Sequence, residues 1–200
     1  MNNDNSNPEK LNSCYLSFLI LLFFSVDQLT KYLVASNVPL ESVLFSFWGF
    51  GITYKINKGF ALHVFEQYEY TILISIIIHI IVTPVVILAY RFYRANYRPS
   101  RIIYTSFLLF ISGNIGNFCD QIFLGNVRDF ILWPGPGTPN FADIFIGISV
   151  IYLFIELLKN PKIDNKSLFN LKSTKNDLIL LKKFFEFSKN EVKLIFKNIE

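Results

Sequence analysis

The stretch YTILISIIIHIIVTPVVILAY, residues 70–90, decides the fold. It contains no Asp, Glu, Lys or Arg, and its length matches the ~20 apolar residues with which a helix crosses the ~30 Å hydrocarbon core of a bilayer. Three further, largely apolar stretches occupy residues 14–35, 102–119 and 141–158. A segment in lipid must satisfy its backbone hydrogen bonds internally, so each is expected to be a helix. The sequence therefore predicts an all-α integral membrane protein with four transmembrane helices.

The composition supports this class. Apolar residues make up 52% of the chain and charged residues only 17%, which is typical of a membrane protein. Nothing in this composition predicts a nucleic-acid partner.

The positive-inside rule orients the bundle. Seven basic residues lie after the second span and at the start of the tail, and only three lie in the opposite connections, residues 36–69 and 120–140. The first group is Arg91, Arg94, Arg98, Arg101, Lys159, Lys162 and Lys166, and the second is Lys55, Lys58 and Arg128. Both termini are therefore predicted to be cytoplasmic. We expect a cytoplasmic N-terminal tail at residues 1–13, a membrane domain at 14–158 and a basic cytoplasmic extension at 159–200.

The C-terminal extension interleaves apolar residues with lysines, as in LILLKKFFEF at residues 178–187. This pattern fits a basic helix lying in the cytoplasmic interface, where anionic lipid attracts it. It fits a solvated, partly ordered extension equally well.

The first outer connection contains SFWGFGITYKIN at residues 46–57. Its aromatic and β-branched residues favour a small strand or hairpin on the membrane surface. Trp48, Phe50 and Tyr54 suit headgroup level, although ordinary packing would explain them equally well. Cys14 and Cys119 lie on different spans, and we expect no disulfide between them.

Two aspartates, Asp129 and Asp143, flank a Pro/Gly loop at the predicted outer surface. Placing a carboxylate at the edge of the hydrocarbon core costs free energy, so a pair of carboxylates there indicates a functional role more than a stabilising one. Asp143 falls in the first turn of a helix, which favours its ionised form, whereas Asp129, in a more enclosed loop, is expected to keep a proton. One ionised and one protonated carboxyl can activate water, as in aspartic proteases. A capping Asp143 and a loop-bonding Asp129 would give the same pattern.

More polar residues lie in the spans near this surface. Asn114, Asn117 and Asp120 are spaced by three, so they share one face of the third helix. Asp27 and Lys31 are four apart on the first helix and can form an ion pair, for which holding the bundle together is the favoured role.

Five short motifs resemble, in order and in membrane placement, those of lipoprotein signal peptidase, the type II signal peptidase of bacteria. They are DQLTK at residues 27–31, NKGFA at 57–61, GNFCD at 116–120, GNVRDF at 125–130 and NFAD at 140–143. The resemblance covers roughly residues 15–158, and the tail lies outside it.

The resemblance implies a membrane aspartic endopeptidase of the bacterial inner membrane, with its active site at the outer face. Its substrates would be diacylglyceryl-modified prolipoproteins, cut before the lipidated cysteine, and its partners otherwise only membrane lipid. It implies no metal, no cofactor and inhibition by the cyclic peptide globomycin, and we expect a monomer. It maps the catalytic dyad onto Asp129 and Asp143. The binding or supporting positions that it implies are Asn57, Gly59, Asn117, Asp120, Gln121, Asn140, Asp27 and Lys31.

The chain departs from the family pattern at four positions. Gln121 stands where an arginine usually follows Asp120, which removes a charge and a fork of donors. Leu62 and Pro139 replace phenylalanines, and Ser112 replaces a glycine. Two alternatives stay open. One is a catalytically inactive homologue that binds lipoprotein precursors, and the other is a small proton-coupled transporter with a relay of carboxylates.

Overall fold

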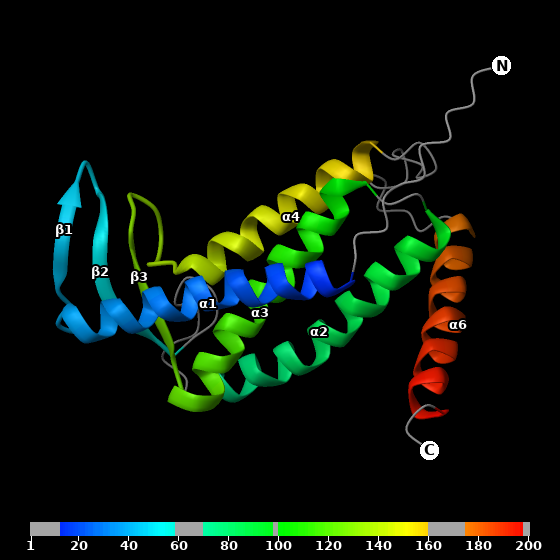
Figure 1. Ribbon diagram of the computed structural model, residues 1–200, viewed down its shortest axis with the longest axis horizontal. Helices are drawn as coiled ribbons and strands as arrows, with labels where there is room; N and C mark the ends of the chain where they lie inside the picture. The colour runs from blue at the N-terminus through cyan, green and yellow to red at the C-terminus, as the bar shows by residue number, and fades with distance from the viewer. Residues whose placement is uncertain (1–12, 59–69, 98–99, 160–174, 198–200) are drawn as a thin grey trace.

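A computed structural model describes residues 13–58, 70–97, 100–159 and 175–197 (Figure 1). Four of its helices are long and apolar enough to cross a membrane, which confirms the predicted fold class. These helices are α1 (Ser13–Asn37), α2 (Thr71–Asn96), α3 (Arg101–Leu124) and α4 (Phe141–Lys159). A small sheet lies at one end of the bundle, and α6 (Lys175–Lys197) lies across the other end, where α1 begins (Figure 1).

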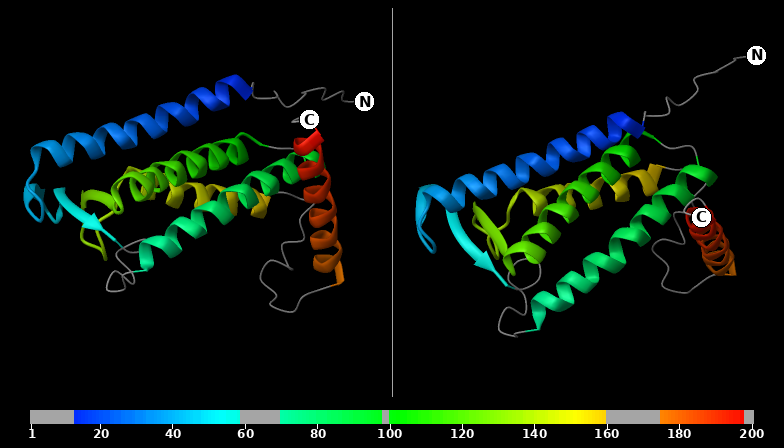
Figure 2. Two further views of the ribbon diagram at one scale, coloured as in Figure 1. Left: turned by 90° about the horizontal axis from the view of Figure 1, so that it is seen from below. Right: turned by 60° about the horizontal axis from the view of Figure 1, so that its bottom comes forward.

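The central helix is α3, which contacts α1, α2 and α4 (Figure 2). Two of its glycines allow neighbours to approach closely. A Cβ atom at Gly113 would lie 2.4 Å from the carbonyl oxygen of Ala142, and one at Gly116 would lie 2.5 Å from Oδ2 of Asp27. Small residues on α3 therefore bring the start of α4 and the middle of α1 to one place.

The sheet is antiparallel, with strand order β1–β2–β3. Its strands are β1 (Val43–Phe47), β2 (Phe50–Asn57) and β3 (Val127–Leu132). The first two form a hairpin that turns at Trp48 and Gly49, whose φ angles of 55° and 83° are those of a two-residue turn with both residues left-handed. The predicted β element between the first two spans is therefore confirmed.

The third strand corrects one expectation. Asp129 lies on β3, opposite Lys55 of β2, and not in a loop. A six-residue stretch gives little strand signal by itself, and its hydrogen-bonding partner lies before α2 in the sequence. On the other side of β3, the backbone N–H groups of Phe130 and Ile131 donate to the carbonyl of Pro139, at 3.3 and 2.8 Å. The backbone around Asp129 is therefore held from both sides.

Aromatic residues at the tip of the hairpin face away from the protein. Trp48 is 85% exposed, Phe47 65% and Phe50 57%, whereas Tyr54 is half-buried. Packing inside the described part of the chain therefore does not explain the tip, while a position at headgroup level does.

Two helices continue beyond their predicted ends. α2 reaches Asn96, and α3 reaches Leu124 before Gly125, with a left-handed φ of 68°, ends it. Asp120 and Gln121 consequently lie in the last turns of α3 and not in the connection after it.

A buried carboxyl, Glu156, joins three helices at the end opposite the sheet. The hydroxyl of Tyr93 on α2 donates to one of its oxygens at 2.7 Å, and the hydroxyl of Ser100 donates to the other. Ser100 also caps α3 by accepting a 3.1 Å hydrogen bond from the backbone N–H of Ile102. This contact holds α4 to the end of α2 and the start of α3.

Candidate active site

One asparagine connects the two predicted catalytic carboxyls. Nδ2 of Asn140 donates to Oδ1 of Asp129 at 2.6 Å, and Oδ1 of Asn140 accepts from the backbone N–H of Asp143 at 3.0 Å. In return, the backbone N–H of Asn140 donates to Oδ2 of Asp143 at 3.1 Å. This reciprocal exchange is a capping box at the start of α4. Asp143 thus caps a helix and also lies close enough to Asp129 for their charges to interact.

Asp129 is enclosed by the protein. It is only 1% exposed, and besides Asn140 its carboxyl accepts a 2.9 Å hydrogen bond from Nδ2 of Asn57. Burial, followed by the negative charge of Asp143, raises the pKa of Asp129 to about 8, although both amide hydrogen bonds act in the opposite direction. Asp129 therefore holds a proton at neutral pH.

Asp143 differs from Asp129 in its surroundings, because it is partly exposed. Its Oδ1 accepts a 2.8 Å hydrogen bond from Nδ2 of Asn117, while Oδ2 accepts the backbone N–H of Asn140. These two hydrogen bonds hold the carboxyl in place at the start of α4. The site thus places a buried, protonated carboxyl beside a more accessible one.

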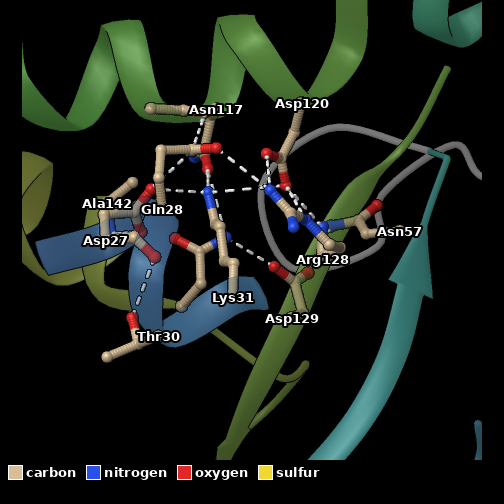
Figure 3. A network of polar contacts seen from close by, with 12 residues as sticks. Asp27, Gln28, Thr30, Lys31, Asn57, Asn117, Asp120, Arg128, Asp129 and Ala142 are labelled. Atoms are coloured by element: carbon tan, nitrogen blue, oxygen red, sulfur yellow. Dashed lines mark hydrogen bonds and ion pairs between the residues drawn. The ribbon is translucent and has the colours of Figure 1, made fainter. Parts of the chain in front are cut away.

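The ammonium of Lys31 joins the acidic residues of two helices (Figure 3). Lys31 is fully buried, and its Nζ lies 2.9 Å from Oδ2 of Asp27 and 3.7 Å from Oδ2 of Asp120. The predicted Asp27–Lys31 pair is therefore confirmed. Nζ also donates to Oδ1 of Asn117 at 2.9 Å, which leaves Nδ2 of Asn117 to donate to Asp143. Lys31 thus orients the amide that holds Asp143.

Asp27 also reaches α4. Its Oδ1 accepts a 2.9 Å hydrogen bond from the backbone N–H of Ala142, one of the first-turn amides that have no partner inside a helix. The next residue, Gln28, donates to the carbonyl of Gly116 at 3.0 Å. α1 is therefore fixed to both α3 and α4 beside the two carboxyls.

Arg128 and Gln28 belong to the same network, although the sequence predicts no role for either. Nε and Nη2 of Arg128 donate to the two oxygens of Asp120 at 3.1 and 2.7 Å, and Nη2 also donates to Gln28 at 3.0 Å. This forked pair fixes β3 to α3 one residue before Asp129. Both residues stand inside the motifs at 27–31 and 125–130, and the charge opposite to that of Asp120 is the signal that could have identified Arg128.

The side chain of Gln121 bonds to α2. Its Nε2 donates to the hydroxyl of Ser75 at 2.7 Å, while its Oε1 is buried and has no hydrogen-bond partner among the described residues. The carboxylate of Asp120 already pairs with Arg128. It therefore has a cation even though residue 121 is a glutamine and not an arginine.

The structure brings most of the predicted site residues together. The residues that contact one another around Asp129 and Asp143 are Asp27, Lys31, Asn57, Asn117, Asp120 and Asn140. Gly59 lies outside the described residues. No group of three His, Cys, Asp or Glu side chains within the described ranges is placed to hold a metal ion.

Asn114 belongs to a different cluster. Its amide oxygen bonds Nδ1 of His79 at 2.7 Å, and its Nδ2 donates to Thr83 at 2.5 Å, both on α2. The helical face predicted for Asn114, Asn117 and Asp120 is therefore divided between a contact to α2 and the network around the two aspartates.

Comparisons with known proteins place the chain in one family. The model of a family described as signal peptidase (SPase) II matches residues 19–159. The lipoprotein signal peptidase of Streptococcus thermophilus is 33% identical over 144 residues, which cover 70% of this chain and 90% of that protein. The one from Chlamydia caviae is 37% identical over 156 residues, covering 73% and 90%. The one from Borreliella burgdorferi is 32% identical over 167 residues, covering 76% and 94%.

Two solved structures share the fold, and both are of bacterial membrane enzymes. One has a TM-score of 0.62 and 23% identity, with 80% of this chain and 94% of that chain covered. The other has a TM-score of 0.61 and 25% identity, with coverage of 72% and 92%.

Proposed function

The chain belongs to the signal peptidase II family, and we propose that it removes the signal peptides of diacylglyceryl-modified prolipoproteins by cutting before the lipidated cysteine. Membership of this family makes it a multi-pass membrane protease. Its chemistry is that of an aspartic endopeptidase, with Asp129 and Asp143 as the catalytic residues.

One observation carries the catalytic assignment. Two carboxyls close enough to interact electrostatically are held by the same asparagine, and burial keeps a proton on Asp129. Two carboxyls that share one proton supply both an acid and a base at the same pH.

The reaction follows from this arrangement. Asp143, as the ionised partner, takes a proton from a water molecule, and the resulting hydroxide attacks the carbonyl carbon of the scissile bond. Asp129 donates its proton to the carbonyl oxygen, which gives a neutral tetrahedral intermediate. Asp143 then gives its proton to the leaving nitrogen, the carbon–nitrogen bond breaks, and a proton from the intermediate returns to Asp129. Peptide bond and water are converted to an acid and an amine, and the pair is restored.

The site lies where such a substrate needs it. Both aspartates stand at the end of the spans beside the sheet, because Asp129 lies on β3 and Asp143 in the first turn of α4 (Figure 1). The distribution of Lys and Arg supports an outward orientation of this end, with both termini cytoplasmic. A diacylated substrate can keep its lipid and signal helix in the membrane while the scissile bond reaches water. Residues 14–158 act as the peptidase domain, and residues 1–13 and 159–200 are extensions to it. The protein acts as a monomer and is inhibited by globomycin.

Cleavage of a purified diacylglyceryl-modified precursor by the full-length protein in liposomes, followed by gel shift, tests the proposal. We expect cleavage by the wild type and at least about a hundredfold loss in Asp129→Asn and Asp143→Asn, each alone. Glu41→Gln, which neutralises an exposed carboxyl outside the network, is the matched control and should cleave normally. Robust cleavage by either dyad variant would exclude the dyad, and an inactive wild type that still binds the precursor would indicate a binding homologue.

A further inference from the structure

The helix α6 lies beyond the part of the chain that matches the family, residues 19–159. It runs crosswise to the four spans at the end of the bundle opposite the sheet, as the views in Figures 1 and 2 agree. When the spans cross a bilayer, a helix in this position lies along the membrane surface.

One edge of α6 is attached to the end of α2. The ring of Phe92 meets those of Phe184 and Phe187 edge to face, each with ring centroids 5.5 Å apart. Arg91, next to Phe92, forms an ion pair with Glu191. These contacts fix the rotation of α6 about its own axis, because they use only one side of the helix.

A second, adjacent side of α6 is apolar, and no described residue covers it in the same way. Its members recur at spacings of three, four and seven residues, so they form one stripe along the helix. They are 40 to 67% exposed, and they are Leu178, Leu181, Phe185, Val192, Ile195 and Phe196. An aromatic and aliphatic stripe of this size is unfavourable in water.

The remaining face of α6 is predominantly basic, and it also carries the exposed residues Glu186, Ile179 and Leu194. Its exposed lysines lie together opposite the contact with α2, and they are Lys182, Lys183, Lys189, Lys193 and Lys197. An apolar stripe beside a row of lysines is typical of a helix that lies in the headgroup region, with its apolar side at the acyl boundary. Phosphate groups of anionic lipid complement the lysines.

We propose that α6 is an interfacial helix that binds anionic lipids at the membrane surface opposite the two aspartates. The stripe enters the acyl boundary, the lysines contact lipid phosphates, and the contact with Phe92 holds the helix at the depth where α2 leaves the membrane. This inference is independent of the peptidase assignment.

Nitroxide labels at Phe185→Cys and Lys193→Cys test it in the full-length chain with Cys14→Ser and Cys119→Ala. Each protein is placed in nanodiscs of phosphatidylcholine with about one third phosphatidylglycerol. We expect the label at position 185 to be about fivefold less accessible to a water-soluble nickel chelate than the label at 193, and more accessible to oxygen. Leu181→Cys provides a second label on the stripe if Phe185→Cys does not fold.

Two changes separate lipid recognition from simple burial. Omitting phosphatidylglycerol, or changing Lys182, Lys183, Lys189, Lys193 and Lys197 to Gln, should raise the nickel accessibility at position 185. Lys58→Gln, at the other end of the molecule, should not. Equal nickel accessibility at 185 and 193 would overturn the proposal in favour of a solvated extension. If the label at position 185 has the same low nickel accessibility with and without phosphatidylglycerol, the anionic-lipid assignment is overturned. Line broadening that disappears on dilution with unlabelled protein would show that a second copy covers the stripe.

Discussion

Nδ2 of Asn140 lies 2.6 Å from Oδ1 of Asp129, while the rest of the same residue caps α4 through Asp143. Asn140 is itself fully buried. The spacing between the two carboxyls is therefore tied to the start of a helix, so a change at Asn140 alters the stability of α4 and the geometry of the two carboxyls together.

Asn140→Ala should reduce both the stability of the protein and its cleavage activity. Loss of the cap costs about 1 kcal/mol of stability, and loss of the bond to Asp129 should lower kcat more than it raises KM. Asn140→Asp keeps an oxygen that can cap the helix but buries a further carboxylate beside Asp129, so it should restore neither thermal stability nor cleavage. Equal activity of the Asp variant and the wild type would show that the amide donor to Asp129 is unimportant. Denaturation in detergent and precursor cleavage measure the two effects.

The pKa of about 8 at Asp129 predicts the alkaline limit of activity. Below that value Asp129 carries the proton that the proposed mechanism needs, and above it the proton is lost, so kcat/KM should fall as pH rises through about 8. Profiles of cleavage from pH 6 to pH 10 would check this. A rate that stays constant across this interval would contradict the assignment of the acid.

The same shift predicts a trend in stability. The pKa of Asp129 in the folded protein lies above the ordinary value of 3.8, so the folded state binds this proton more tightly than the unfolded state does. Its contribution to stability is complete below about pH 4 and is lost as pH rises through about 8. Asp129→Asn should flatten that part of the profile, measured as unfolding temperature against pH.

Lys31→Met should destabilise the protein strongly. It leaves Asp27 buried without its cation, and breaking a buried ion pair from one side costs about 3–5 kcal/mol. The double variant Asp27→Asn/Lys31→Met removes both charges and should recover part of the loss. Unfolding in mixed detergent would measure the stability of Lys31→Met, Asp27→Asn and the double variant. If the effects of the two single changes simply add up in the double variant, Asp27 and Lys31 do not stabilise each other.

Gly116→Ala should disturb the network although it replaces no charged residue. The added methyl group would lie 2.5 Å from Oδ2 of Asp27, the oxygen that contacts Lys31, so we expect a loss of about 1–3 kcal/mol and lower activity. Gly147→Ala on α4 is the matched control, because nothing lies within 4 Å of the added carbon. If the two variants had the same stability and activity, close packing would not be the reason for glycine at position 116.

The residue at the unusual position can be tested directly. Gln121→Arg should keep activity, since arginine retains a donor for Ser75 and Asp120 keeps its own cation. An inactive arginine variant would show that the surroundings have adapted to glutamine. Cleavage at saturating precursor distinguishes that result from weaker substrate binding.

The sequence predicts the spans because apolar length is a local property, whereas the site roles of Asn57 and Asn140 are expected only from the resemblance to a family. The pair of Asp27 and Lys31 is visible as two residues one turn apart. The partner of Asp120 is not, since Arg128 reaches it only after Gly125 has ended α3 and β3 has turned back along it. The strand at Asp129 was hidden for the same reason: its pairing with β2 joins segments separated by two transmembrane helices.

The bonded network also sets a charge balance at the membrane edge. Its four carboxyls, at Asp27, Asp120, Asp129 and Asp143, face the two cations of Lys31 and Arg128. With the proton on Asp129, one negative charge is left uncompensated. A site of that sign repels the phosphates of the surrounding lipid headgroups and accepts an uncharged peptide backbone. On the proposed assignment, the two carboxyls of Asp129 and Asp143 would thereby stay clear of the lipid phosphates around them.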